Sequence, residues 1–236
     1  MAWTYVAQVE GGSYGDTNAM TADSTLHVEV GDVLIGVLGW RCASATTDGM
    51  DIGSGVDNFT MLAQSADDQD DYLSLGYVVV GTHNETATVR GTFSTAAGIV
   101  CLLVMQFRPD AGETITLAAG PSPATAASGT NPTSGNISPA GSDLLAWGGI
   151  RLRNEGSFSE HQIATTAADG YRNHAGLAYC AIWYKLFTAN QTGIAAECTT
   201  GGGKYVIDVA ALSSASASTP DPITWTVHTH RRVDFT

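Results

Sequence analysis

The chain has 236 residues, of which 44% are hydrophobic and 14% are charged. Acidic residues outnumber basic ones by 23 to 10, so the formal net charge is −13. This balance argues against nucleic acids and anionic membranes as partners, because phosphate binding needs clustered lysine and arginine. The hydrophobic content is too high for a disordered chain and sufficient for a buried core.

The first residues show no basic segment followed by an apolar stretch, so we expect no signal peptide. The longest apolar run is Ile99–Met105, which is too short to cross a bilayer. It suits a strand that is buried on both faces.

No long window has helical periodicity, whereas short alternating segments separated by Gly, Asn and Asp are frequent. This pattern predicts an all-β fold, specifically an antiparallel two-sheet sandwich of the jelly-roll kind. In chain order, the first strands are expected at residues 5–9, 25–30, 31–37, 73–80, 86–93 and 99–107.

A weak internal repeat indicates that the sandwich consists of two similar halves. Gly31-Asp32 precedes an apolar strand in the first half, and Gly141-Ser142-Asp143 precedes one in the second. Later landmarks recur with similar offsets, including expected strands at 181–187 and 205–212. Each half alone would expose an apolar face, so one sandwich of residues 1–212 is favoured over two separate domains. Its halves are about 1–110 and 138–212, joined by an irregular connection over 111–137.

The C-terminal region has a different composition. Residues 213–222 are rich in Ser, Ala and Pro and predict a linker. Residues 223–236 predict a strand or arm in which Ile223, Trp225 and Val227 share one side. This arm either folds back on its own domain or docks on a neighbouring subunit.

Several residues could carry chemistry, although a structural interpretation is favoured for each. Ser13 lies in a G-x-S-x-G pattern, but no strand-to-helix context surrounds it, so a glycine-rich loop is favoured. His228 and His230 share one strand face and could bind a metal, with Asp234 or His27 as a guessed third ligand. A solvated histidine pair is favoured over that site.

Acidic residues gather between positions 48 and 71. Asp48, Asp51 and Asp57 on a glycine-rich loop are weak calcium candidates, since their spacing does not match an EF-hand. A solubilising acidic rim is favoured. The run of residues 67–71 is expected in a loop, because like charges resist burial without cations.

The four cysteines form no C-x-x-C motif, so zinc-ribbon and thioredoxin motifs are excluded. Free buried thiols are favoured over disulfides, for which three pairings would be possible. Trp40, Trp147 and Trp183 lie within apolar runs and are assigned to the core.

The order of landmarks over residues 5–212 resembles a known family. Gly31-Asp32-Val33-Leu34-Ile35 is followed by Phe59-Thr60-Met61-Leu62 and then by Tyr77-Val78-Val79-Val80-Gly81-Thr82-His83-Asn84-Glu85-Thr86-Ala87-Thr88-Val89. This pattern resembles the jelly-roll-type β-sandwich domains of tailed-bacteriophage virion proteins, among them head decoration and tail proteins.

The resemblance implies a non-enzymatic virion structural protein without a cofactor, most specifically a capsid decoration protein. Its partners would be phage capsid or tail proteins, and it would form a homo-oligomer, with a trimer possible, on virions assembled in the host cytoplasm. The alternatives are a tail or fibre component, a carbohydrate- or receptor-binding module that uses the loops between residues 46 and 71, and a hydrolase based on Ser13 or an aspartate pair.

The terminal aromatic and cationic residues are the expected partner contacts. They are set apart by their position near the ends of the chain and, for the arginines, by clustered positive charge on an acidic protein. The set comprises Trp3, Trp225, Arg231, Arg232 and Phe235.

Overall fold

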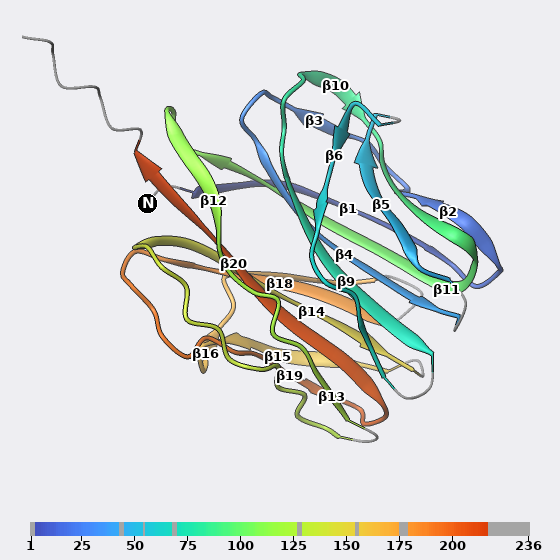
Figure 1. The fold of residues 1–236 in the computed structure, drawn as a ribbon. Helices are drawn as coiled ribbons and strands as arrows, with labels where there is room; N and C mark the ends of the chain where they lie inside the picture. The colour runs from blue at the N-terminus through green and yellow to red at the C-terminus, as the bar shows by residue number, and fades with distance from the viewer. Residues whose placement is uncertain are drawn as a thin grey trace, which may run out of the picture.

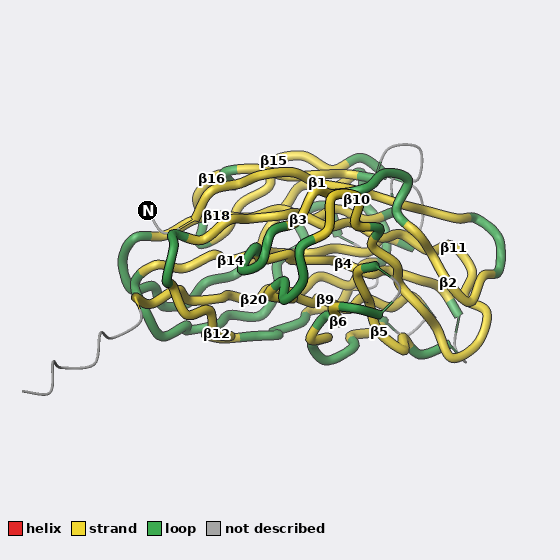
Figure 2. The backbone as a smooth tube through the Cα atoms, turned by 90° about the horizontal axis from the view of Figure 1, so that it is seen from above, coloured by secondary structure: helices red, strands yellow, loops and turns green. Residues whose placement is uncertain are grey.

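The computed structural model describes residues 3–42, 45–53, 55–67, 70–126, 129–153, 156–174 and 179–216. All regular elements in these ranges are β-strands, which confirms the all-β fold class (Figure 2). None of the described residues forms a helix that is long and apolar enough to cross a membrane.

The first half has a central antiparallel sheet with two short strands, β7 and β8, on the outer edge of β9. Its strand order is β1 (Trp3–Ser13), β11 (Val89–Pro109), β4 (Val33–Arg41) and β9 (Asp71–Val79), with β7 at Thr60–Met61 and β8 at Ser65–Ala66.

Smaller sheets cover the outer face of this central sheet. The long strand β11 leaves the central sheet at its N-terminal end, where it pairs with β2 (Thr17–Thr21) and β5 (Thr47–Ile52). The strand β6 (Asp57–Asn58) extends this sheet, and β3 (Leu26–Val28) pairs with β10 (Asn84–Ala87).

The second half repeats this arrangement. Its central sheet has the order β12 (Glu113–Ala119), β20 (Tyr205–Ser216), β14 (Asp143–Leu152), β18 (Cys180–Phe187) and β17 (Gly170–Asn173), with β13 (Ala124–Ala126) also on β20. Its outer sheet is formed by β16 (Thr166–Ala167), β15 (Phe158–Ile163) and β19 (Ala196–Thr200). The order β1-β11-β4-β9 in the first half therefore corresponds to β12-β20-β14-β18 in the second.

The backbone conformation explains why a glycine recurs before the central strand of each half. Gly31 precedes β4 with φ +93°, and Gly141 precedes β14 with φ +110°. Glycine adopts this left-handed region without the steric cost that a Cβ imposes. The repeat in the sequence therefore marks the turn that starts each central strand.

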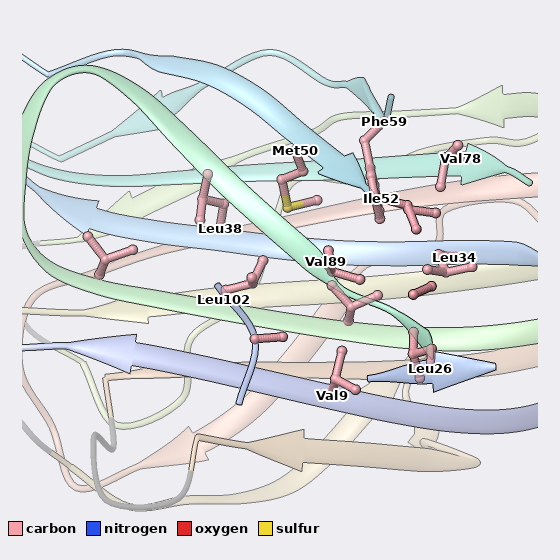
Figure 3. Packing of buried hydrophobic residues seen from close by; sticks show 14 of the residues in the cluster. Val9, Leu26, Leu34, Leu38, Met50, Ile52, Phe59, Val78, Val89 and Leu102 are labelled. Carbon is pink, nitrogen blue, oxygen red and sulfur yellow. The ribbon is translucent and has the colours of Figure 1, made fainter. Parts of the chain in front are cut away.

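The two central sheets pack face to face, and each carries an outer sheet on its other face (Figure 1). In β4, Val33, Ile35 and Val37 belong to the core between the two halves. The alternate residues Leu34, Leu38 and Trp40 belong to the core under the outer sheets of the first half (Figure 3 shows part of this core).

The same alternation occurs in β14. Leu145 and Trp147 face the first half, whereas Leu144 and Ala146 face the outer sheet of the second half. Because strand side chains alternate between faces, a strand buried on both faces is apolar throughout. The molecule is thus a sandwich of two central sheets extended to four layers, rather than two sheets alone.

Several expectations from the sequence need correction, and the first two concern the connections along the chain. The connection 111–137 is not wholly irregular, because β12 and β13 both pair with β20. The linker does not begin at residue 213, because β20 continues to Ser216. Hydroxyls of Ser214 and Ser216 donate to the carboxylate of Glu113 at 2.8 and 2.9 Å.

Trp3 is the third correction. It is 3% exposed and belongs to the core between the halves, with its Nε1 3.4 Å from the carbonyl oxygen of Asp143. The side chain is buried because β1 pairs along almost its whole length with β11, which holds Trp3 opposite Pro109. Trp3 is therefore a packing residue and is not available as a surface contact.

Two sets of predictions, one for tryptophans and one for cysteines, can be compared with the structure. Trp40, Trp147 and Trp183 are fully buried, as predicted. Cys101, Cys180 and Cys198 are buried free thiols, whereas Cys42 is partly exposed.

A buried ion pair crosses the boundary between the two halves. Arg151 of β14 and Asp71 of β9 are both fully buried, and Arg151 Nη2 lies 3.1 Å from Asp71 Oδ1. Arg41 Nε lies 3.3 Å from the same oxygen. Asp71 thus starts a strand instead of lying in the expected acidic loop, and two arginines supply the cations that its burial requires.

A second buried carboxylate, Asp208 of β20, faces the same boundary. Ser65 of β8 donates to its Oδ2 at 3.2 Å, and the Ser122 amide donates to Oδ1 at 2.7 Å. Burial raises the pKa of Asp208 to about 6, although the hydrogen bonds that it accepts act in the opposite direction. Among the residues that the structure describes, no cation compensates this carboxylate in the way that the arginines compensate Asp71.

Asp208→Asn should remove a pH dependence of stability. Since the folded protein holds the Asp208 proton up to a pH of about 6 and the unfolded chain only to about 3.9, ionisation destabilises the fold between these values. The unfolding free energy of the wild type, relative to the variant, should fall by about 2 kcal/mol as the pH rises from about 4 to about 7. Urea unfolding across this range measures the difference, and a constant difference would contradict the assignment.

Candidate functional site

A groove opens at one end of the molecule, where turns from the two halves approach each other. Its volume is about 950 Å³. It is lined by residues 29–32 before β4, by residues 108–113 between β11 and β12, and by Thr4, Val79 and Ile115. Glu113, which lines the groove, accepts hydrogen bonds from Ser214 and Ser216 near the end of β20.

Asp32 organises one wall of the groove. It is 1% exposed and accepts hydrogen bonds from the Glu29 amide at 2.9 Å and from Gln106 Nε2 at 2.6 Å. Arg108 adds a two-pronged contact through Nε at 2.7 Å and Nη2 at 2.9 Å. Burial alone would raise the pKa of Asp32, but these hydrogen bonds outweigh it and hold the pKa below its usual value. The carboxylate therefore fixes both the turn and the arginine at the groove.

A ring of two histidines and two glutamates lies beside this wall. His27 is in β3 and Glu29 follows it, while His83 precedes β10 and Glu85 lies within it. Asn84 is the antiparallel partner of Val28, and residues two apart on a strand share a face. This register brings His27 and Glu29 opposite His83 and Glu85. We call these four residues the His–Glu ring.

Each carboxylate of the His–Glu ring contacts both imidazoles. Glu29 lies 2.8 Å from His27 Nε2 and 2.8 Å from His83 Nδ1. Glu85 lies 2.8 Å from His27 Nδ1 and 3.2 Å from His83 Nε2. The four side chains are between 44% and 70% exposed, so solutes reach them from solvent.

The electrostatics of the ring follow from these contacts. The hydrogen bond to Glu29 is the largest cause of the raised pKa of His27. Hydrogen bonds to His27 and His83 lower the pKa of Glu29. The ring therefore favours a positively charged occupant, whether protons on the imidazoles or a cation among the ligand atoms.

The aspartates singled out by sequence do not converge. Asp51 is 6% exposed and contacts Arg90 Nη2 at 3.0 Å. Asp57 accepts hydrogen bonds from the amides of Gly81 and Thr82, both at 3.1 Å, and Asp48 is exposed. Across the described ranges, the set of three ligating side chains that does come together is His27, Glu29 and His83, with ligand atoms within 4.8 Å of one another.

Sequence reasoning reached His27 only as a guessed partner for His228 and His230. A signal for the ring was nevertheless present, because His27-Val28-Glu29 and His83-Asn84-Glu85 are two copies of an H-x-E tripeptide. What the sequence does not reveal is that β3 and β10 pair with each other, with Val28 opposite Asn84, 56 residues further along the chain.

Of the remaining candidate residues, Ser13 can be placed in the structure and those of the C-terminal arm cannot. Ser13 ends β1, its hydroxyl contacts the backbone of Gly15, and strand β2 follows, so the strand-to-helix setting of a nucleophile elbow is not formed there. Trp225, Arg231, Arg232 and Phe235, together with His228 and His230, lie outside the described residues.

A second, smaller hollow of about 300 Å³ lies at the seam between the halves. Tyr5 and Tyr171 line it and are 39% and 59% exposed. The Tyr5 ring stacks on Tyr184 with centroids 5.8 Å apart and planes 8° apart. Gln8 and Asp169 add polar groups to the same hollow.

Comparison of the chain with protein-family models, with curated proteins and with solved structures finds no match in any of the three.

Asp32→Asn tests the role of the buried carboxylate in the groove wall. Loss of the charge-assisted contacts with Arg108 should lower the unfolding free energy at pH 7 by about 1.5–3 kcal/mol. Because the folded pKa of Asp32 is depressed, this contribution is complete above a pH of about 4 and declines as the pH falls further. Urea unfolding at pH 7 and at about pH 3 measures both effects.

The matched control for this variant is Asp110→Asn, since Asp110 lines the same groove but is exposed. The control should leave the unfolding free energy within about 0.5 kcal/mol of the wild type. An Asp32→Asn variant as stable as this control at pH 7 would show that Asp32 does not hold the groove wall.

Proposed function

We propose that this protein is a non-enzymatic structural protein of a tailed-bacteriophage virion and that it decorates the assembled capsid. One observation carries the proposal. The described residues extend to Ser216, whose hydroxyl donates to the carboxylate of Glu113, and the sequence beyond them combines alternating apolar residues with paired arginines. The landmark pattern of residues 5–212 supports the same function by its resemblance to virion β-sandwiches.

The charge distribution suits such a component. A net charge of −13 makes free copies repel one another and remain soluble. The pair Arg231 and Arg232 carries the opposite sign on the segment proposed to make contact. Trp225 and Phe235 add the large aromatic surface that dominates many interfaces.

Assembly would strengthen these contacts. Several arms on one homo-oligomer, such as a trimer, bind a repeating lattice with far higher avidity than one arm alone. The alternation at residues 223–229 supports pairing of the arm with an exposed sheet edge of a neighbouring protein.

Truncation after Ser216 tests the arm. The shortened chain keeps β20 and the contacts of Ser214 and Ser216 with Glu113, so its circular dichroism and unfolding midpoint should match those of the full chain. Its co-sedimentation with particles that lack this protein should be lost. Trp225→Ala should also weaken co-sedimentation, whereas the matched arm variant Thr229→Ala should not. Full binding by the truncated chain would refute the arm as the anchor.

The seam hollow supports a second candidate, a carbohydrate- or receptor-binding module. Sugars bind against exposed aromatic faces flanked by amide and carboxylate groups, and Tyr5, Tyr171, Gln8 and Asp169 provide both. This location replaces the loops between residues 46 and 71 that sequence alone suggested.

For this candidate, a glycan array probed with the wild-type chain should yield a ligand whose affinity falls about tenfold in Tyr171→Ala, since one aromatic contact contributes about 1.4 kcal/mol. Tyr14→Ala is the matched control, because Tyr14 is 58% exposed but does not line the hollow. Equal glycan binding by Tyr171→Ala and the wild type would exclude the seam hollow as the site.

A further inference from the structure

We propose that the His–Glu ring binds one divalent transition-metal ion, with Zn²⁺ as the reference ion, through His27, His83 and Glu29, while Glu85 accepts hydrogen bonds from the two imidazoles. This inference does not depend on the proposed virion function.

The first argument is a count of hydrogen-bond donors. The ring has four close contacts between imidazole nitrogens and carboxylate oxygens. A neutral imidazole has one N–H, and an ionised carboxylate has none. Two neutral histidines therefore supply donors for only two of the contacts, and the other two need either further protons on the imidazoles or a cation. A single ion of charge +2 bound by His27 Nε2, His83 Nδ1 and Glu29 replaces two contacts, and the remaining N–H of each imidazole then donates to Glu85.

The second argument concerns the type of ligand. Imidazole nitrogen and carboxylate oxygen together suit Zn²⁺ and neighbouring transition metals, whereas Ca²⁺ and Mg²⁺ prefer oxygen ligands alone. Two histidines and one carboxylate leave one position for water in a tetrahedral site. The composition of the ring thus predicts that it binds Zn²⁺ in preference to Ca²⁺ or Mg²⁺.

The third argument is geometric. The ligand atoms of His27, Glu29 and His83 lie within 4.8 Å of one another. In a tetrahedral site, ligands at about 2.0–2.1 Å from Zn²⁺ are about 3.4 Å apart, so ligand atoms up to 4.8 Å apart have to approach by as much as about 1.4 Å. Half-exposed side chains at a surface can make this adjustment without displacing a packed core.

The backbone that carries the ring is already held in place. Gln106 Nε2 donates to the His27 carbonyl oxygen at 2.9 Å, and Asp32 accepts the Glu29 amide. The strands β3 and β10 form a two-stranded sheet (Figure 1). A metal ion bound to both strands would therefore link them and stabilise the folded protein.

Isothermal titration calorimetry of the full chain, first treated with a chelator, tests the site. Zn²⁺ should bind with one saturable site per chain and raise the unfolding temperature, and Ca²⁺ at the same concentrations should do neither. His83→Ala should abolish both effects. Because His83 is 44% exposed, this variant should remain folded, and His83→Gln provides a second variant that keeps a polar side chain.

The double variant His228→Ala/His230→Ala is the matched control, since it removes two histidines outside the ring. It should retain the full Zn²⁺ binding and the full thermal shift. Zn²⁺ binding that survives in both His83 variants, that disappears in the double variant, or that is matched by Ca²⁺ would overturn the proposal, as would the absence of saturable binding to the wild type.

Discussion

The structure depends on one constraint, which is that the central strands of both halves are buried on both faces. In β4, successive side chains enter two different cores, the one between the halves and the one under the outer sheets. Neither central sheet can be covered by a single partner layer, so four layers result. Polar groups at the boundary then need partners from the other half, which explains why Arg151 meets Asp71 and why Ser65 meets Asp208.

The turn before β4 links this packing to the candidate site. Gly31 allows the left-handed turn that starts the strand, and Asp32 is held beneath it by Arg108 and Gln106. The same network fixes the amide of Glu29, which belongs to the His–Glu ring. In the first half, the feature that starts a buried strand therefore also positions the side chains that could bind a cation.

Much of the fold could be predicted from the sequence because buried strands leave a local signal. The apolar runs and the repeated glycine turns indicated β4, β14 and the all-β class, and Trp40, Trp147 and Trp183 were correctly assigned to the core. Edge strands such as β12 leave a weaker pattern, and the burial of Trp3 depends on pairing across more than 100 residues. The ring was missed for the same reason, since its two H-x-E tripeptides become neighbours only when β3 pairs with β10.

The central claim is that the two similar halves form one cooperative body. Native-state hydrogen exchange followed by mass spectrometry tests it most directly, because exchange of core amides reports the free energy of the opening that exposes them. We predict that amides of β4 and β11 in the first half and of β14 and β20 in the second exchange through one common opening, with the same dependence on denaturant. Exchange of β14 and β20 at a clearly lower free energy than β4 and β11 would contradict the account and show two independent domains.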